Sequence, residues 1–321
     1  MSTLPDTMLY GSYDFDWEEY TASRPLYPKQ LYDIIFQHHS KAGGKYSRAL
    51  DVGCGPGTVT DVLASRLRGE IIGCDVNDKQ LKVAQTRLAH HGPRIRFQKS
   101  TAEDLGWMGN HSADLVACAE AIHWIDAARF VSEAARVLRP NGTLAIWFYY
   151  PTVLMPSSTE VTAIHCHTLR ANLQRTMTRN AGKPVVSYLK DTWRSELDNI
   201  AFPQNLWKNE TRIRWNCQED NWYRFDPSHA VERIDRRGFG SEGYVEKNVD
   251  DLSLELETAR DSMSRSFTPA QFRQYVSSID IVQDEDWPEM DHALAEIGRL
   301  LGPGERINVA WVAVMTLATR R

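Results

Sequence analysis

Short apolar runs alternate with amphipathic stretches over the first half of the chain. Strands are predicted where nearly every position is apolar, at residues 49–52, 70–74, 95–98, 113–119 and 143–149. Helices are predicted where apolar residues recur every three or four positions, at residues 29–40, 58–68, 78–88 and 127–138. Because apolar strands separated by helices are typical of a buried parallel sheet, this pattern predicts an α/β fold with helices on both faces.

Two of these helices carry more specific predictions. The first places Leu31, Ile34, Ile35 and His38 on one face. The third follows the second strand, and Asp78 is expected to cap its amino end.

The alternation weakens after residue 150, where residues 151–200 read as helical and residues 211–215 as a sixth strand. The final run at residues 307–317, "INVAWVAVMTL", predicts a strong last strand that returns to the same sheet. We therefore expect one domain over residues 1–321. We expect a cofactor-binding core at residues 49–149, helical substrate-side insertions at residues 151–210 and 218–305, and the final strand of the same sheet at residues 307–317.

Composition narrows the class of protein. The formal net charge is −5 and the pI is about 6.1, which does not favour nucleic acid as a partner. No run of 18 apolar residues predicts a membrane span, and the first residues do not read as a signal peptide. Five widely spaced cysteines indicate a reduced, cytoplasmic protein. No metal site is expected at His165 and His167, because residues two apart do not share a helix face.

A glycine-rich turn follows the first strand in "ALDVGCGPGTVT" and carries Gly53, Gly55 and Gly57. Such a turn lets the backbone approach a nucleotide-type ligand closely, and Asp75 at the end of the second strand suits two ribose hydroxyls. A dinucleotide would favour G-x-G-x-x-G, whereas this spacing is G-x-G-x-G. Asp51 just before the turn favours a ligand with an ammonium or sulfonium group, such as S-adenosylmethionine. Beyond the third strand, Thr101, Ala102 and Glu103 are expected near its adenine ring.

Five segments together resemble class I S-adenosylmethionine-dependent methyltransferases: "LDVGCGPGT", "GCDVN", "TAED", "ADLVACAEAIHWID" and "AARVLRPNGTLAIW". The resemblance extends from about residue 15 to the final strand. "YTASRPLYP", "AEAIHWID" and "PAQFRQYV" resemble the trans-aconitate methyltransferase branch, especially its fungal members. The resemblance implies a Rossmann-like, seven-stranded, mostly parallel sheet.

The resemblance also implies roles in cofactor binding. Asp51 and the glycine turn would hold the methionine end of the cofactor, Asp75 the ribose, and Arg24 the methionine carboxylate. Further cofactor contacts are expected from Tyr20, Val76, Ala119 and Glu120. The chain departs from the branch at residues 277–280 and 187–189, both on the expected substrate side, so the acceptor is not fixed by the resemblance.

Catalytic and acceptor residues are expected beyond the fourth and fifth strands. His123 is either a general base or a structural histidine beside Trp124, and Glu120 is a second catalytic candidate. An acceptor that is already ionised needs no base. Trp147 and Tyr149 would wall the acceptor pocket, and Arg233 would bind an acceptor carboxylate.

The leading functional hypothesis is O-methylation of a small carboxylic acid. The alternatives are O-, N- or C-methylation of a fungal secondary metabolite, and cofactor binding without methyl transfer, as in a regulator or a pericyclase-type protein. A dinucleotide-dependent oxidoreductase fits the glycine spacing less well. The expected partner is a small-molecule acceptor, and the sequence does not specify an oligomeric state.

Overall fold

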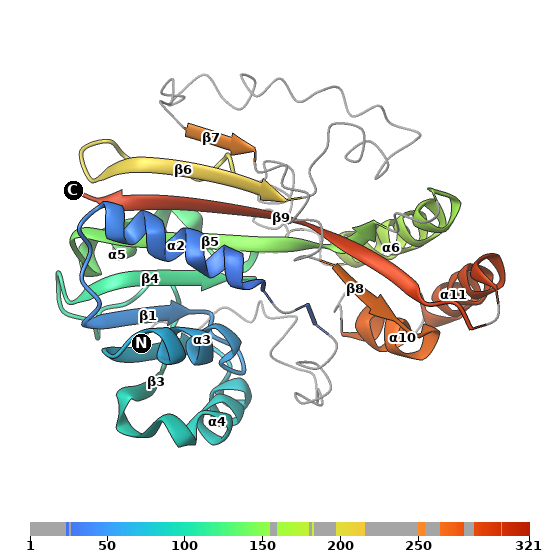
Figure 1. Cartoon of the computed structure of the whole chain (residues 1–321), viewed down its shortest axis with the longest axis horizontal. Coiled ribbons are helices and arrows are strands. Elements are labelled where there is room, and N and C mark those ends of the chain that lie inside the picture. Colours follow the sequence, from blue (N-terminus) through green and yellow to red (C-terminus); the bar gives the residue numbers. More distant parts are fainter. Residues whose placement is uncertain are drawn as a thin grey trace.

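One sheet organises the part of the chain that the computed structural model describes, namely residues 24, 25, 27–154, 159–179, 182, 197–215, 250–253, 264–278, 286–302 and 304–321. The strand order is β3-β2-β1-β4-β5-β9-β6-β7, and β8 also pairs with β9 (Figure 1). The strands are β1 (Arg48–Val52), β2 (Glu70–Asp75), β3 (Ile95–Lys99), β4 (Ala113–Ala119), β5 (Leu138–Leu154), β6 (Trp207–Trp215), β7 (Asp250–Ser253), β8 (Ser264–Phe267) and β9 (Ile307–Arg320).

The first five strands are parallel, so their carboxyl ends meet along one edge of the sheet. β9 runs antiparallel between β5 and β6. The path from β3 to β6 confirms the seven-stranded, mostly parallel, Rossmann-like prediction. Two short strands, β7 and β8, extend the sheet beyond these seven.

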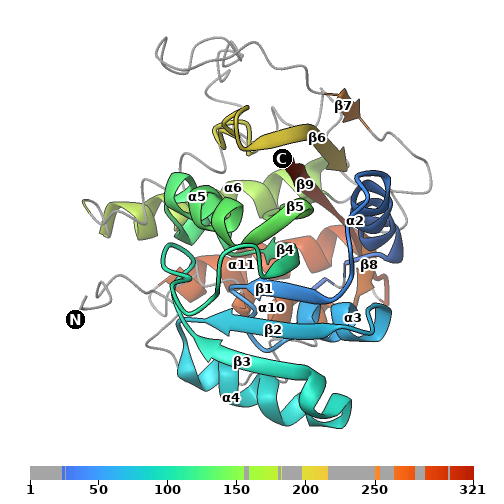
Figure 2. The same ribbon diagram turned by 90° about the vertical axis from the view of Figure 1, so that its left-hand side faces the viewer.

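Helices cover both faces of the sheet, as the apolar strands require. The helices are α2 (Lys29–Lys41), α3 (Thr58–Arg66), α4 (Asp78–Arg87), α5 (Ala127–Val137), α6 (Thr159–Arg179), α10 (Pro269–Ser277) and α11 (Trp287–Leu301). Alternate residues of β4 point to opposite sides: Leu115 joins a core with α2 and α3, whereas Val116 joins a core with α5. Figure 2 shows this layering from the end of the sheet.

The amino-terminal half of β9 extends past the carboxyl end of β4 and pairs there with the last residues of β5 (Figure 1). There it pairs with β8, and α10 and α11 lie beside this extension (Figure 1). The late segments of the chain thus flank the edge at which ligands bind in open α/β sheets.

The helix predictions need two corrections. The buried positions of α2 include Tyr32 and His39 rather than Ile34 and His38, which are only half-buried. His39 is accommodated because its ring bonds to Thr143 Oγ1 at 2.9 Å, and a satisfied polar group can be buried at little cost.

The amino end of α4 also differs from the prediction. Asn77, not Asp78, is the capping residue, because the Asn77 side-chain oxygen accepts from the backbone N–H groups of Lys79 and Gln80. Asp78 lies one position later, in the first turn, where a carboxylate suits the positive end of the helix.

Asp114 fastens the amino ends of three strands. Its carboxylate accepts from the backbone N–H groups of Ser47 and Arg48 at 2.7 and 2.9 Å and from Arg139 at 2.7 Å. Burial alone would raise the pKa of Asp114, but these donors outweigh it and hold the pKa below its ordinary value.

Replacing this carboxylate should destabilise the whole sheet. Asp114→Ala leaves Arg139 and two N–H groups without their acceptor, so we expect a loss of about 2–4 kcal/mol in the free energy of unfolding. Urea denaturation monitored by circular dichroism measures it. The exposed Glu305→Ala variant is the control, and a loss for Asp114→Ala as small as the control's would contradict the assignment.

Candidate active site

The turn after β1 is built on left-handed glycines. The φ angles of Gly53, Gly55 and Gly57 are 66°, 52° and 84°. Residues other than glycine rarely occupy this left-handed region of backbone conformation. A Cβ on Gly53 would lie 2.4 Å from the Cβ of Ala121, the second residue beyond β4. The turn is therefore packed directly against the carboxyl end of β4, and Gly57 caps α3.

Asp75 links this turn to the end of β2. Its carboxylate accepts from Gly55 N at 2.9 Å and from Asn77 N at 2.8 Å. Burial raises the pKa of Asp75, while these backbone donors oppose the rise. Val76, which stands between Asp75 and Asn77 in the sequence, is half-buried.

Asp51 is a buried carboxylate that is only half satisfied. Thr60 Oγ1 on α3 donates to Asp51 Oδ2 at 2.6 Å, whereas the buried Oδ1 atom has no hydrogen-bond partner among the described residues. Burial raises the pKa of Asp51 to about 7. An unsatisfied buried carboxylate is costly, so this arrangement fits a cationic ligand group. The sequence analysis gave Thr60 no role, although a hydroxyl group about one turn into the helix that follows the glycine turn could have indicated a partner for Asp51.

The loop after β3 brings the expected adenine-side residues close to α5. Ala102 is buried, and Thr101 and Glu103 are half-buried. Glu103 accepts from the backbone N–H of Asp126 at 2.9 Å, and Asp126 in turn caps α5. Glu103 thus has a structural contact in addition to its proposed position near the ligand.

Glu120 follows Ala119, the last residue of β4, in a left-handed conformation with φ at 52°. Its backbone N–H donates to Trp147 O at 3.0 Å, and its carboxyl group accepts from Tyr149 N. Burial raises the pKa of Glu120 to about 8, against the hydrogen bond from Tyr149 and the charge of Arg24. A left-handed non-glycine residue is uncommon, and such residues cluster at functional sites.

Arg24 reaches the same edge from the amino-terminal segment. Its guanidinium donates to Tyr149 Oη at 3.1 Å and to the backbone carbonyl of Ser278, just after α10. Its charge also lowers the pKa of Tyr275, although burial of that phenol raises the pKa more. The amino-terminal segment, the end of β4, β5 and the end of α10 therefore converge beside Glu120. The sequence analysis placed residues 277–280 on the substrate side, but it gave Tyr275 no role and did not join Ser278 to Arg24, because no local pattern connects them.

His123 lies in a short helix, η3 (Ile122–Trp124), and is buried. Its ring lies 5.1 Å from that of Trp124 and 6.1 Å from that of Phe148. Burial lowers the pKa of His123 to about 3, and the nearby Arg24 charge lowers it further. A histidine of such low basicity is neutral at pH 7 and is a weak proton acceptor.

Trp147 and Tyr149 lie on one face of β5, where that strand passes the carboxyl end of β4. Tyr27 packs edge-on against Trp147 with 5.6 Å between ring centres, and Tyr32 packs against it at 6.2 Å. Trp147 is buried, and its Nε1 has no hydrogen-bond partner among the described residues. Tyr27 and Tyr32, which the sequence reading did not single out, extend the aromatic wall toward Asp51. Burial chiefly raises the pKa of Tyr32, and the Asp51 charge raises it further.

Two predicted site residues, Tyr20 and Arg233, lie outside the described residues. The same holds for the departures at 187–189 and at 279–280. Of the cysteines, Cys54, Cys74 and Cys118 are buried free thiols. None of the described helices has the length and apolarity needed to cross a membrane.

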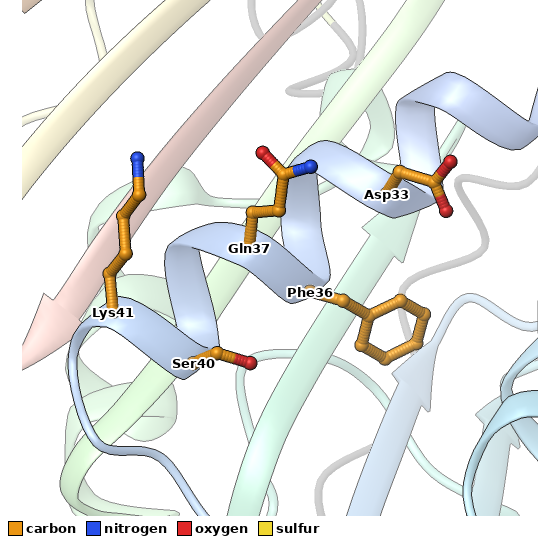
Figure 3. Close-up of a pocket in the computed structure, with 5 residues that line it drawn as sticks. All are labelled: Asp33, Phe36, Gln37, Ser40 and Lys41. Carbon is orange, nitrogen blue, oxygen red and sulfur yellow. The ribbon is translucent and has the colours of Figure 1, made fainter.

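A surface cavity of about 410 Å³ lies on α2 (Figure 3). All of its lining residues come from that one helix, namely Asp33, Phe36, Gln37, Ser40 and Lys41. The carboxyl end of α2 lies over the beginning of β5, where His39 bonds to Thr143. This cavity is therefore near the amino ends of the strands, away from Asp51 and Glu120.

Comparisons with known proteins agree with this geometry. A family model described as a methyltransferase domain matches residues 50–146. The chain is 32% identical to methyltransferase cfoB of Aspergillus candidus over 97% of each protein. It is 26% identical to methyltransferase ptaI of Pestalotiopsis fici over 95% of this chain and 93% of the relative. A solved structure of a candidate type II methyltransferase from Anaeromyxobacter dehalogenans has a TM-score of 0.55 and 19% identity, covering 92% of this chain and 97% of that one. That likeness shows a shared fold.

The fold, the glycine turn and these relatives define an enzyme that transfers methyl groups. The chain belongs to the class I S-adenosylmethionine-dependent methyltransferases, and S-adenosylmethionine is its cofactor. The buried, half-satisfied Asp51 fits the ammonium group of that cofactor.

The packing of the glycine turn can be tested directly. Gly53→Ala forces a side chain into the left-handed region and against Ala121, so we expect at least tenfold weaker S-adenosylmethionine binding in calorimetry. Adding Ala121→Gly removes the clash but not the φ penalty, so the double variant should recover only part of the affinity. Binding by Gly53→Ala equal to that of the wild type would argue against a close-packed cofactor turn.

Proposed function

We propose that this methyltransferase transfers the methyl group to a carboxylate oxygen of a small organic acid. One observation carries the proposal: the Arg24 guanidinium lies with Tyr149 Oη at the edge where Glu120 follows β4. A guanidinium and a hydroxyl group are suitable donors to a carboxylate. Because such an acceptor is ionised at pH 7, it does not require the proton acceptor that His123 supplies poorly.

S-adenosylmethionine, when bound, supplies an electrophilic methyl group on a sulfonium that leaves in an in-line displacement. We propose that Asp51 and the glycine turn hold its methionine end and that Asp75 accepts from its ribose hydroxyls. Thr101, Ala102 and Glu103 would contact the adenine ring, with Val76 and Ala119 beside the nucleoside. These assignments are supported by the unsatisfied Asp51 Oδ1 and by the way Gly55 ties Asp75 to the turn.

We propose that Glu120 acts in its neutral form. Burial raises its pKa to about 8, so at pH 7 its carboxyl group keeps a proton through which it can donate a hydrogen bond to an acceptor oxygen. Arg24 then supplies the positive charge at this edge, either to the acceptor or, as the resemblance implies, to the methionine carboxylate. Trp147 and Tyr149 would exclude water around the reacting atoms.

A second candidate function is methylation of a hydroxyl group on a larger fungal metabolite. It is favoured by the same residue, because a carboxyl group with a pKa near 8 is close to the optimum for a general base. In that case Glu120 would act ionised and accept the acceptor's proton. Methylation at nitrogen or carbon and cofactor binding without transfer are further alternatives, which labelled product would separate.

Three finer assignments belong with this proposal. We propose membership of the trans-aconitate methyltransferase branch, supported by "AEAIHWID" and "PAQFRQYV". We propose a single domain in which residues 49–149 bind the cofactor and the later segments shape the acceptor side. We propose a cytoplasmic location, supported by the buried free thiols.

The cofactor assignment predicts a defect at the end of β2. Asp75→Ala removes a charged hydrogen-bond acceptor, so we expect S-adenosylmethionine binding to weaken by at least about 1 kcal/mol, roughly fivefold in Kd. Isothermal titration calorimetry measures the change. The matched control is Asp78→Ala, an exposed carboxylate three residues away. Equal affinities for the two variants would refute the ribose assignment.

The direction of the pH profile identifies the role of Glu120. With a carboxylic acid acceptor, kcat/KM should fall as pH rises through the pKa of Glu120, about 8, because ionised Glu120 no longer donates a hydrogen bond and repels the anionic acceptor. Glu120→Gln should flatten this limb and retain activity. His123→Asn should lower kcat less than tenfold.

The assay follows labelled methyl transfer by mass spectrometry with a panel of polycarboxylic acids and phenols. Rising activity through the same pH range on a phenol, together with loss of activity in Glu120→Gln, would replace the first candidate with the second. Cofactor binding without labelled product from any acceptor would contradict both.

A further inference from the structure

Three potential metal ligands meet on the surface beside the glycine turn. They are Asp61 on α3 and His90 and His91 in the short helix η2 (Ala89–Arg94) that follows α4. One donor atom from each residue lies within 4.8 Å of the donor atoms of the other two. His91 Nε2 lies 2.6 Å from Asp61 Oδ1, and the two imidazole rings are 4.1 Å apart between centres.

The segment that carries the histidines is fastened to α3 and to the turn. Arg94 donates to the carbonyl oxygens of Leu67 and Ala64, at 2.7 and 3.0 Å. Arg87 donates to the carbonyl of Pro56 within the glycine turn. These anchors hold the two histidines against Asp61 without a metal ion, so the ligands are already organised.

The Nδ1 atom of His90 makes a hydrogen bond of a kind that is common in metal sites. His90 Nδ1 lies 3.0 Å from the carbonyl oxygen of Arg87. A carbonyl can only accept, so Nδ1 carries the proton and Nε2 is the nitrogen that keeps a lone pair for a metal. Metal-bound histidines commonly donate their other N–H to a carbonyl or carboxylate in this way, which fixes the tautomer that binds the metal.

We propose that Asp61, His90 and His91 form a binding site for a divalent transition metal, with zinc as the principal candidate. Two imidazole nitrogens and one carboxylate oxygen suit zinc better than magnesium or calcium, which favour oxygen ligands. Three protein ligands at an exposed position leave a fourth position for water. On binding, the proton of His91 Nε2 moves to Nδ1 or is released to solvent, and the Asp61–His91 hydrogen bond is replaced by bonds to the ion. The donor atoms then separate to about 3.3 Å as tetrahedral ligation requires.

The metal would join α3 to the segment after α4. Asp61 lies in the first turn of α3, and its backbone N–H donates to Gly57 O at 2.9 Å. A bound ion therefore fastens together two elements that flank the cofactor turn and stabilises the fold by binding the native state. This site does not depend on the identity of the methyl acceptor.

The test uses the full-length, tag-free protein and zinc chloride as the probe. Calorimetry should show one site that binds zinc with micromolar or tighter affinity, and zinc should raise the thermal unfolding midpoint by about 2 °C or more. Cobalt(II) should give the visible absorption of a tetrahedral site with nitrogen and oxygen ligands.

Variants separate this site from metal binding elsewhere. His90→Gln should weaken zinc binding at least tenfold while leaving the apo-protein's stability unchanged, because His90 is exposed. His91→Gln and Asp61→Asn should weaken zinc binding as strongly. His292→Gln, an exposed histidine on α11, is the matched control and should bind like the wild type.

Two outcomes would overturn the proposal. One is the absence of zinc binding by the wild-type protein at a zinc concentration 100 times the expected micromolar Kd. The other is equal zinc affinity in His90→Gln and His292→Gln. In that second case Asp61 and His91 form only a hydrogen bond, and His90 has no part in metal binding.

Discussion

The buried carboxylate of Asp51 is the constraint on which the cofactor site depends. A carboxylate enclosed by protein is costly unless hydrogen bonds or opposite charge compensate it, and Thr60 satisfies only one of its oxygens. The fold accepts this cost at the end of β1, directly before a turn whose three glycines leave the backbone open to a ligand. Under the proposed cofactor placement, this unsatisfied oxygen is the group that an ammonium of the bound cofactor would compensate.

The acceptor side depends on a second strained position. Glu120 adopts a left-handed conformation, which costs about 1–3 kcal/mol for a non-glycine residue in such a region. Two hydrogen bonds with β5 offset this cost. The N–H of Glu120 donates to Trp147 O, and its carboxyl group accepts from the N–H of Tyr149. The same bonds aim the carboxyl group toward the edge where Arg24 enters, so the strain and the placement of the functional group have one cause.

The seven strands from β3 to β6, the glycine turn and the position of Asp75 could be predicted from the sequence because their signals are local, whereas β7 and β8 lie in a segment expected to be helical. An apolar run, a G-x-G-x-G spacing and an acid after a strand each lie within a few residues. The contact between Arg24 and Ser278 spans 254 residues and leaves no periodic signal. The capping residue of α4 was misassigned because Asn77 and Asp78 are both good caps, and only the backbone angles decide between them.

The choice between an acid and a hydroxyl acceptor is a question of where one proton resides. His123 is held neutral by burial, and the Arg24 charge makes its protonation still less favourable. Glu120 is the one group of the two whose pKa lies near physiological pH. If its proton stays on the carboxyl group, the edge offers donors and a guanidinium, which is an environment for an anion. If the proton leaves, the edge offers a base, which is an environment for a phenol or alcohol. The residues around Glu120 are compatible with both, so under the two proposals the fold alone does not decide the acceptor, and the protonation state of this carboxyl group distinguishes them.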